Sequence, residues 1–155
     1  MPFAQAQHQR FVSNGVQPHH ENATVAEISK GLLVLLAIEA GDGLTDLAFL
    51  KKKILNLRVL EDEQGKMNLS LLDAGGSVLM VSQFTLYGDS RKGNRPSYSR
   101  AAPPTLAKEL YDELIKQLRQ EGVTVETGKF QAAMKVALVN DGPVTLIVDS
   151  NKQYY

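Results

Sequence analysis

The chain has 155 residues, of which 43% are hydrophobic and 22% charged, a composition typical of one globular domain with a buried core. Its 17 basic and 17 acidic residues cancel, so any contact with nucleic acid must rest on local basic patches. The absence of cysteine excludes a thiol nucleophile, disulfides and cysteine-based zinc sites. The longest apolar run, 31–38, is far shorter than the roughly 20 residues of a membrane span, and the first residues do not resemble a secretory signal. We expect a single domain over residues 1–155 and a cytoplasmic location.

The first elements that the sequence predicts are a strand and a helix. Residues 31–38 are continuously apolar, which indicates a strand covered on both faces. After a turn, leucine or isoleucine recurs every three or four residues from Leu44 to Leu57, which predicts an amphipathic helix. An extended piece then starts at Val59 and is interrupted by the turn-forming residues 61–66.

Two neighbouring strands are predicted next, at 69–72 and 77–86, followed by a long polar and basic loop over 87–104. A second helix is predicted after this loop, because leucines recur four residues apart behind two prolines and a glycine follows them, at Leu106, Leu110, Leu114, Leu118 and Gly122. Alternating or apolar segments predict three last strands, at 123–126, 134–139 and 144–148.

The predicted strands outnumber the two predicted helices, and the helices interrupt the strands without strict alternation. This order favours an α+β fold in which a curled or closed sheet carries two helices.

Familiar catalytic machinery is missing from the sequence. It contains no nucleophile elbow, no phosphate-binding loop and no zinc-protease or dinucleotide motif. All three histidines, His8, His19 and His20, lie within the first 20 residues, where a solvated role is more typical than that of a catalytic base. We therefore expect neither a metal ion nor a cofactor.

Two polar segments remain as candidates for the site. Residues 82–86, Ser-Gln-Phe-Thr-Leu, end an apolar strand just before the basic loop, and residues 140–145, Asn-Asp-Gly-Pro-Val-Thr, form a turn. On local chemistry alone, the first is an ordinary solvent-facing strand end and the second an ordinary hairpin turn.

Taken together with other segments, these two make a specific pattern. In order along the chain stand KILNLRV (53–59), EDE (61–63), GKMN (65–68), SQFTL (82–86), RKGNRP (91–96), TGKF (127–130) and NDGPVT (140–145). This ordered set resembles the D-aminoacyl-tRNA deacylase family, and the resemblance runs from about residue 28 to residue 150.

The resemblance implies a symmetric homodimer of a small, barrel-like α+β fold, with a mostly antiparallel sheet, two packed helices and active sites at the subunit interface. It implies that a Ser-Gln-Phe-Thr segment forms the floor of the site, which here consists of Ser82, Gln83, Phe84 and Thr85.

The resemblance also implies a chiral gate. A Gly-Pro pair joined by a cis peptide bond, Gly142 and Pro143 in this sequence, would reach in from the partner subunit and reject L-amino acids. Asn140 and Met134 are assigned to the same substrate pocket.

The implied activity is hydrolysis of the ester bond of D-aminoacyl-tRNA, with glycine mischarged on tRNA as a further possible substrate. Such an ester is already activated and has a neighbouring ribose hydroxyl, so the protein needs mainly to position it and to offer backbone N–H donors to the oxyanion. We interpret Thr85 as lining the site rather than as a nucleophile, because the sequence supplies no base beside it.

Basic residues of the long loop, Arg91, Lys92 and Arg95, are candidates for contact with tRNA phosphates, with a solvated loop as the alternative. Residues 1–27 depart from the family pattern: Gln9-Arg10-Phe11 resembles its first strand, but Pro18 stands where a hairpin is expected. The competing function is a non-catalytic nucleic-acid-binding module on the same fold, which the balanced charge and the intact motifs disfavour.

Overall fold

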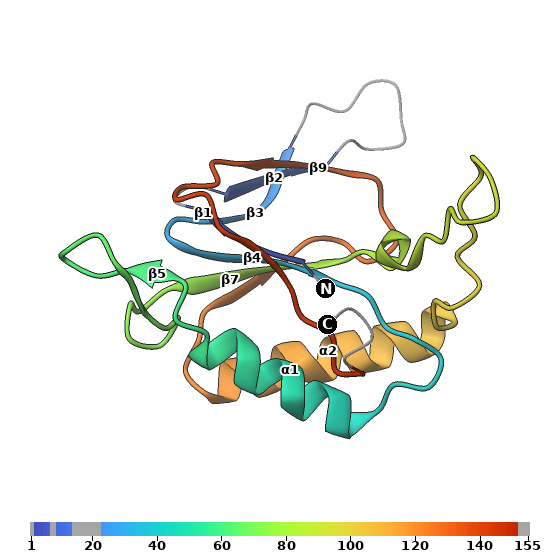
Figure 1. Cartoon of the computed structure of the whole chain (residues 1–155), viewed down its shortest axis with the longest axis horizontal. Helices are drawn as coiled ribbons and strands as arrows, with labels where there is room; N and C mark the ends of the chain where they lie inside the picture. Colours follow the sequence, from blue (N-terminus) through green and yellow to red (C-terminus); the bar gives the residue numbers. More distant parts are fainter. Residues whose placement is uncertain (1, 7–8, 14–22, 152–155) are drawn as a thin grey trace.

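Three layers make up the fold in the computed structural model, which describes residues 2–6, 9–13 and 23–151. The strands are β1 (Pro2–Ala6), β2 (Gln9–Ser13), β3 (Ala23–Ile28), β4 (Gly31–Leu36), β5 (Leu60–Glu61), β6 (Met67–Leu69), β7 (Ser77–Ser82), β8 (Val125–Thr127), β9 (Met134–Leu138) and β10 (Thr145–Ile147). The helices are α1 (Leu44–Asn56), α2 (Pro104–Gln120) and the short 3₁₀ helix η1 (Phe84–Tyr87). Helices α1 and α2 form one outer layer, and the sheet of β2, β3 and β9 forms the other (Figure 1).

The middle layer is a five-stranded sheet with the order β10-β1-β4-β7-β8. Strands β4, β7 and β8 are parallel to one another, whereas β1 pairs antiparallel with both β4 and β10. The parallel pairs arise because α1 connects β4 to β7 and α2 connects β7 to β8, and a helical crossover returns the chain in the same direction.

The α+β class with two packed helices is confirmed, but the expected barrel is corrected in two respects. The described strands form separate sheets of five, three and two strands rather than one closed barrel. The strands that carry the helices are parallel rather than antiparallel, because both helices serve as crossovers.

The middle sheet has a hydrophobic core on each face. Along β4, Leu32, Val34 and Leu36 face the helices, while Leu33 packs in a second core with Ala26 and Ile28 of β3. This alternation follows from the two-residue period of a strand, and it explains why a strand buried on both faces has a continuously apolar sequence.

Both predicted helices are confirmed. Leu47, Leu50 and Ile54 of α1 are buried, and so are three of the four leucines that predicted α2, at Leu110, Leu114 and Leu118. Gly122, with φ of 84°, follows α2 in the left-handed conformation that commonly ends a helix. In the described part of the chain, neither helix is long and apolar enough to cross a membrane.

Two strand predictions need correction. The strand expected at 69–72 ends at Leu69 and gives way to a turn, and the strand expected at 77–86 ends at Ser82, after which the chain forms η1. Near the N-terminus, β2 pairs with β3 and β9, while Pro18 and the three histidines lie outside the described residues.

Candidate active site

A cleft of about 780 Å³ opens where β7 ends. Its walls come from three places: the end of β7 with the start of η1, the segment that enters α2, and the connection between β8 and β9. The residues that line it are mostly apolar and include Ser82, Gln83, Phe84, Tyr98, Ala101, Ala102, Pro103, Tyr111, Gly128, Lys129, Phe130, Gln131 and Met134.

The floor of the cleft extends the central sheet. The N–H of Gln83 donates to the carbonyl oxygen of Leu36 over 2.7 Å, which adds a last rung beyond the final β4–β7 pair, Leu36 and Ser82. Phe84 follows with a side chain that is 55% exposed and packs edge-on against Tyr98, with 5.3 Å between the ring centroids. The floor is therefore tied to β4 through Gln83 and to Tyr98 through the ring of Phe84.

The backbone N–H groups at the start of η1 differ from their neighbours in hydrogen bonding. The N–H groups of Gln83, Leu86 and Gly88 donate to carbonyl oxygens within the protein. Those of Phe84 and Thr85 lie in the first turn of η1, where a helix provides no acceptor for its N–H groups. The side-chain amide of Gln83 donates to the Thr85 hydroxyl, and Thr85 itself does not line the cleft of its own chain.

Tyr111 of α2 forms the inner wall. Its side chain is only 4% exposed, and its hydroxyl donates to the carbonyl oxygen of Met80 over 2.9 Å. Burial raises the pKa of the Tyr111 hydroxyl above its ordinary value, so the group stays a neutral donor. The ring of Phe130 packs beside it at 5.9 Å between centroids.

The connection between β8 and β9 closes the cleft from the other side. The end of the Met134 side chain packs directly on the backbone of Gly128, in space that a Cβ there would occupy. Gln131, with φ of 60°, adopts a left-handed backbone that side chains other than glycine and asparagine rarely take. This strained turn places Gln131 on the lining of the cleft.

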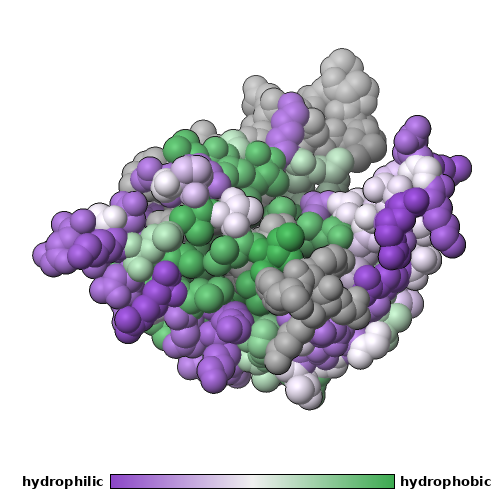
Figure 2. Space-filling view, viewed as in Figure 1, coloured by the Kyte–Doolittle hydropathy of each residue, from purple (hydrophilic) through white to green (hydrophobic). Residues whose placement is uncertain are grey.

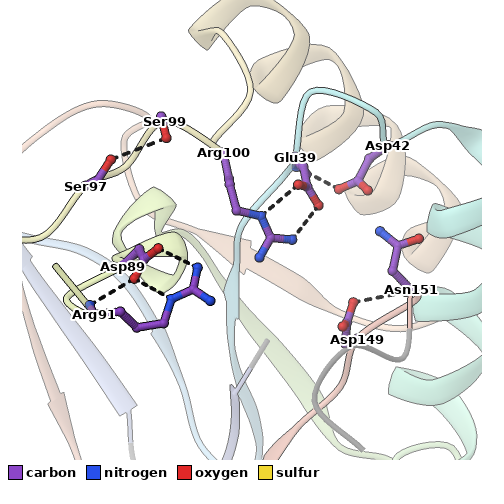
Figure 3. Close-up of polar contacts among 9 residues, drawn as sticks. All are labelled: Glu39, Asp42, Asp89, Arg91, Ser97, Ser99, Arg100, Asp149 and Asn151. Atoms are coloured by element: carbon purple, nitrogen blue, oxygen red, sulfur yellow. Dashed lines mark hydrogen bonds and ion pairs between the residues drawn. The ribbon is translucent and has the colours of Figure 1, made fainter.

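The basic loop between η1 and α2 is held at its base by paired backbone bonds. Asp89 and Ser97 each donate an N–H to the carbonyl of the other, over 2.8 and 2.9 Å. The guanidinium of Arg91 binds the Asp89 carboxylate over 2.7 and 2.9 Å (Figure 3), and it holds the pKa of that carboxyl well below its usual range. Lys92 and Arg95 are exposed in the segment that connects Asp89 to Ser97.

Arg100 anchors the other end of this loop. Its guanidinium makes two bonds to the Glu39 carboxylate, over 2.9 and 3.0 Å (Figure 3), and it also lies over the ring of Tyr87 in η1. Asp42 accepts the N–H of Glu39 over 2.8 Å, and burial raises the pKa of the Asp42 carboxyl. The end of η1, the loop and the turn before α1 are thereby fixed to one another.

The sequence-predicted site residues fall into three groups. Ser82, Gln83, Phe84 and Met134 meet in the cleft, and Thr85 follows directly behind its floor. Arg91, Lys92 and Arg95 lie on the neighbouring loop. Asn140, Gly142 and Pro143 do not line the cleft of their own chain.

The turn at 140–143 differs from the expectation in its peptide bond. No peptide bond in the described residues is cis, so the Gly142–Pro143 bond is trans, and the expected cis bond is wrong for this chain. Trans is the form that an X–Pro bond adopts unless its surroundings impose the other, and Gly142 and Pro143 are exposed here. Asn140 donates its side-chain amide to the Thr145 hydroxyl over 3.1 Å, within the same turn.

Several cleft residues were not predicted from the sequence. Tyr98, Tyr111 and Phe130 are three of the four aromatic residues that line the cleft. Of these, only Phe130 lay in a segment with a recognisable signal, the Thr-Gly-Lys-Phe stretch at 127–130. Tyr111 was indistinguishable from a core residue, because it lies on the buried face of an amphipathic helix.

In the described side chains, no group of three or more aspartates, glutamates or histidines could hold a metal ion. The histidines themselves lie outside the described residues.

The fold and the cleft define an α+β protein with an aromatic-lined cleft at the end of a buried strand. The profile of the D-Tyr-tRNA(Tyr) deacylase family matches residues 8–149. A protein of Thermosipho africanus is 57% identical over 86% of this chain and 90% of its own length, and one of Clostridioides difficile is 56% identical over 84% and 88%. Both are named D-aminoacyl-tRNA deacylase. The chain belongs to this deacylase family, as its motifs predicted.

Two solved structures share the fold. One, described as a c-Myc DNA unwinding element binding protein, superposes with a TM-score of 0.86 at 35% identity and covers 96% of this chain and 97% of its own. The other, described as a probable eukaryotic D-amino acid tRNA deacylase, has a TM-score of 0.74 at 18% identity, over 94% and 96% of the two chains. The second likeness concerns the fold alone.

Proposed function

We propose that this protein hydrolyses the ester bond of D-aminoacyl-tRNA and releases the free D-amino acid and tRNA. The observation that carries the proposal is the cleft floor, where Ser82, Gln83 and Phe84 meet the ligand space in a chain of the deacylase family. A cleft of about 780 Å³ is within the usual range for small-ligand sites, roughly 300–1,000 Å³, and suits the aminoacylated terminal nucleotide.

The chemistry needs little beyond positioning. Water attacks the ester carbonyl, the carbonyl oxygen gains negative charge, and the ribose oxygen leaves with a proton. The N–H group of Phe84 is suited to stabilise that charge, since it lies at the cleft and has no acceptor within η1. Ser82 and Gln83 lie beside it on the floor, and the Ser82 hydroxyl would orient the substrate.

We propose that the protein works as a homodimer. Val136, Leu138, Val139, Leu146 and Ile147 are large apolar residues that lie exposed on β9, β10 and the connection between them. Figure 2 shows hydrophobic surface across the face over which the red C-terminal segment, including β10, crosses the molecule. Strands β9 and β10 are edge strands of their sheets, so this surface suits a second copy of the chain.

In the proposed dimer, the turn at 140–143 would contribute to the cleft of the partner subunit. This turn connects the two apolar edge strands and does not line the cleft of its own chain, so it is suited to reach the partner's cleft. Gly142 has a φ of 127° and no side chain, so the backbone of the turn can approach a ligand closely there. A backbone wall there would collide with the side chain of an L-residue and leave room for a D-residue, and for glycine. This wall does not require a cis bond.

The decisive experiment compares D-Tyr-tRNA with L-Tyr-tRNA as substrates of the purified protein. We expect rapid hydrolysis of the D-ester and little of the L-ester. Gly142→Ala should lower the rate on every substrate, because it forces a side chain into a left-handed backbone at the proposed wall. A matched control is Gly41→Ala, where the added methyl meets open space. Similar rates on the two esters would refute the chiral function.

A second candidate is nucleic-acid binding without turnover. It is favoured by the described neighbour at 35% identity, whose name refers to DNA binding. It would be supported if the protein bound single-stranded DNA as tightly as tRNA and hydrolysed neither ester.

A further inference from the structure

A second hollow, of about 340 Å³, lies beside the cleft along α2. Tyr111, Gly128 and Phe130 line both spaces, so the two hollows are direct neighbours. We call this hollow the α2 groove; its other lining residues are Lys108, Asp112, Ile115, Lys116, Arg119 and Thr127.

Three cations line the α2 groove. Lys108 lies 5.9 Å from the ring centroid of Phe130, at the junction with the cleft, and Lys116 lies two turns further along the helix. Arg119 donates to the carbonyl oxygen of Val125 over 2.6 Å. A guanidinium has five N–H donors, so this bond fixes Arg119 at the groove without exhausting them.

Each of the two lysines forms an ion pair with a carboxylate one turn away on its own helix. Lys108 contacts Asp112, and Lys116 contacts Glu113 over 3.1 Å. Such exposed pairs, one turn apart on a helix, contribute only about 0.3–0.5 kcal/mol each, so an incoming phosphate can compete for the lysines.

We propose that the α2 groove binds the phosphate backbone of the RNA strand that leads to the nucleotide held in the cleft. This inference rests on the proposed deacylase function. The groove shares three lining residues with the cleft, and its cations come from the helix that forms the cleft wall. The basic loop with Lys92 and Arg95 projects away from the body of the molecule (Figure 1), so it is placed to meet more distant phosphates.

The charge that each substitution removes determines whether the binding of tRNA becomes weaker or stronger. Lys108→Ala and Lys116→Ala should each weaken the binding of uncharged tRNA about three- to tenfold and make it less dependent on salt, because each removes one phosphate contact. Asp112→Asn should strengthen it, because it removes a carboxylate that repels phosphate and competes for Lys108. The matched control is Lys66→Ala, an exposed lysine on the β5–β6 hairpin.

A truncated substrate separates this inference from the proposed function. D-Tyr-adenosine has the ester and the terminal nucleoside but no upstream phosphates. We expect the ratio of kcat/KM for D-Tyr-tRNA to kcat/KM for D-Tyr-adenosine to fall three- to tenfold in the two lysine variants. The same ratio should rise in Asp112→Asn and keep its wild-type value in Lys66→Ala.

Each outcome decides one question. If wild-type protein hydrolyses D-Tyr-adenosine and the ratio and the tRNA affinity stay unchanged in all three groove variants, the α2 groove takes no part in RNA binding. If wild-type protein hydrolyses neither ester, the deacylase proposal fails, and the binding of uncharged tRNA by the variants still decides whether the groove holds RNA.

Discussion

Phe84 combines two functions that can be separated by substitution. Its ring packs against Tyr98 at the cleft, and its N–H is the donor proposed for the oxyanion. Phe84 is the first residue of η1, and proline is tolerated at the first position of a helix because the N–H there has no helical acceptor. The backbone donor can therefore be removed at a position where the local conformation allows it.

We predict that Phe84→Pro is about 100-fold slower than Phe84→Ala in single-turnover hydrolysis of D-Tyr-tRNA. Both variants lose the ring, and only proline also loses the N–H, whose removal from an oxyanion site costs about 10²–10³ in rate. Circular dichroism and thermal melting should show that both variants fold. Equal rates would mean that this N–H does not stabilise the transition state.

Thr85 gives the complementary test, because its hydroxyl is held by Gln83 behind the cleft floor. We predict that Thr85→Val, which keeps the shape and the N–H, lowers kcat less than tenfold. Removing a true nucleophile lowers kcat by several orders of magnitude, about 10⁶ in a well-studied serine protease. A loss of that size, measured on D-Tyr-tRNA, would make Thr85 the nucleophile.

Tyr111 couples the cleft wall to the stability of the fold at high pH. Its pKa is raised in the folded protein, so its stabilising contribution is complete below the ordinary tyrosine pKa of about 10 and is lost as the pH rises above that value. We predict that Tyr111→Phe is less stable by about 1–2 kcal/mol at pH 8, because the carbonyl of Met80 loses its donor.

The difference between the two proteins should narrow above pH 10, in urea unfolding followed by circular dichroism. Tyr87, whose pKa burial also raises, remains in the variant, so part of the alkaline loss of stability should persist there. A constant difference across this range would mean that Tyr111 titrates normally.

Among the elements, the loop between η1 and α2 has the clearest testable role. Its base is fixed by the Asp89–Ser97 pair and by Arg100. Lys92 and Arg95 are exposed in the segment that connects Asp89 to Ser97. We predict that Lys92→Ala and Arg95→Ala raise KM for D-Tyr-tRNA several-fold with little change in kcat, because phosphate contacts bind substrate and transition state alike. The salt dependence of KM should weaken in both. Steady-state kinetics at two salt concentrations would reveal a merely solvated loop by an unchanged slope.

The elements also show which parts of the fold the sequence could predict. Leu110, Leu114 and Leu118 revealed α2 because helical period and burial agree there. The end of β7 was missed, because the apolar run 78–81 continues into a segment, 82–86, that could also be extended. Strand β4 ends at Leu36, so past the Gln83–Leu36 bond β7 has no neighbour on that side, and the chain forms η1 instead. Where the neighbouring strand β4 ends is set by the tertiary structure and cannot be predicted from the sequence of β7 alone.

The same reason limits prediction of the site. Ser82, Gln83 and Phe84 were found because they form one contiguous motif. Tyr98, Tyr111 and Gln131 join them only through packing between segments far apart in the chain, and the left-handed backbone of Gln131 has no sequence signal of its own.

For the whole molecule, the exposed apolar edge predicts an assembly that a point charge should break. Val139 is 60% exposed in the single chain, so aspartate there costs the monomer little. We predict that Val139→Asp sediments as a monomer and loses most of its activity on D-Tyr-tRNA, whereas wild type sediments as a dimer. Val25→Asp, at a valine that is 43% exposed on β3, is the matched control and should stay dimeric and active. An active monomer would contradict the proposed role of the turn at 140–143.

The bond from the Gln83 N–H to the Leu36 carbonyl ties the cleft floor to the most deeply buried strands of the protein. Amide hydrogens in such a position exchange with solvent only when a large part of the structure opens. The Gln83 amide should therefore exchange with deuterium as slowly as amides inside β7, and far more slowly than those of the loop at 90–96. Heat would then abolish catalysis and unfold the central sheet at the same temperature, since the floor has no way to loosen first.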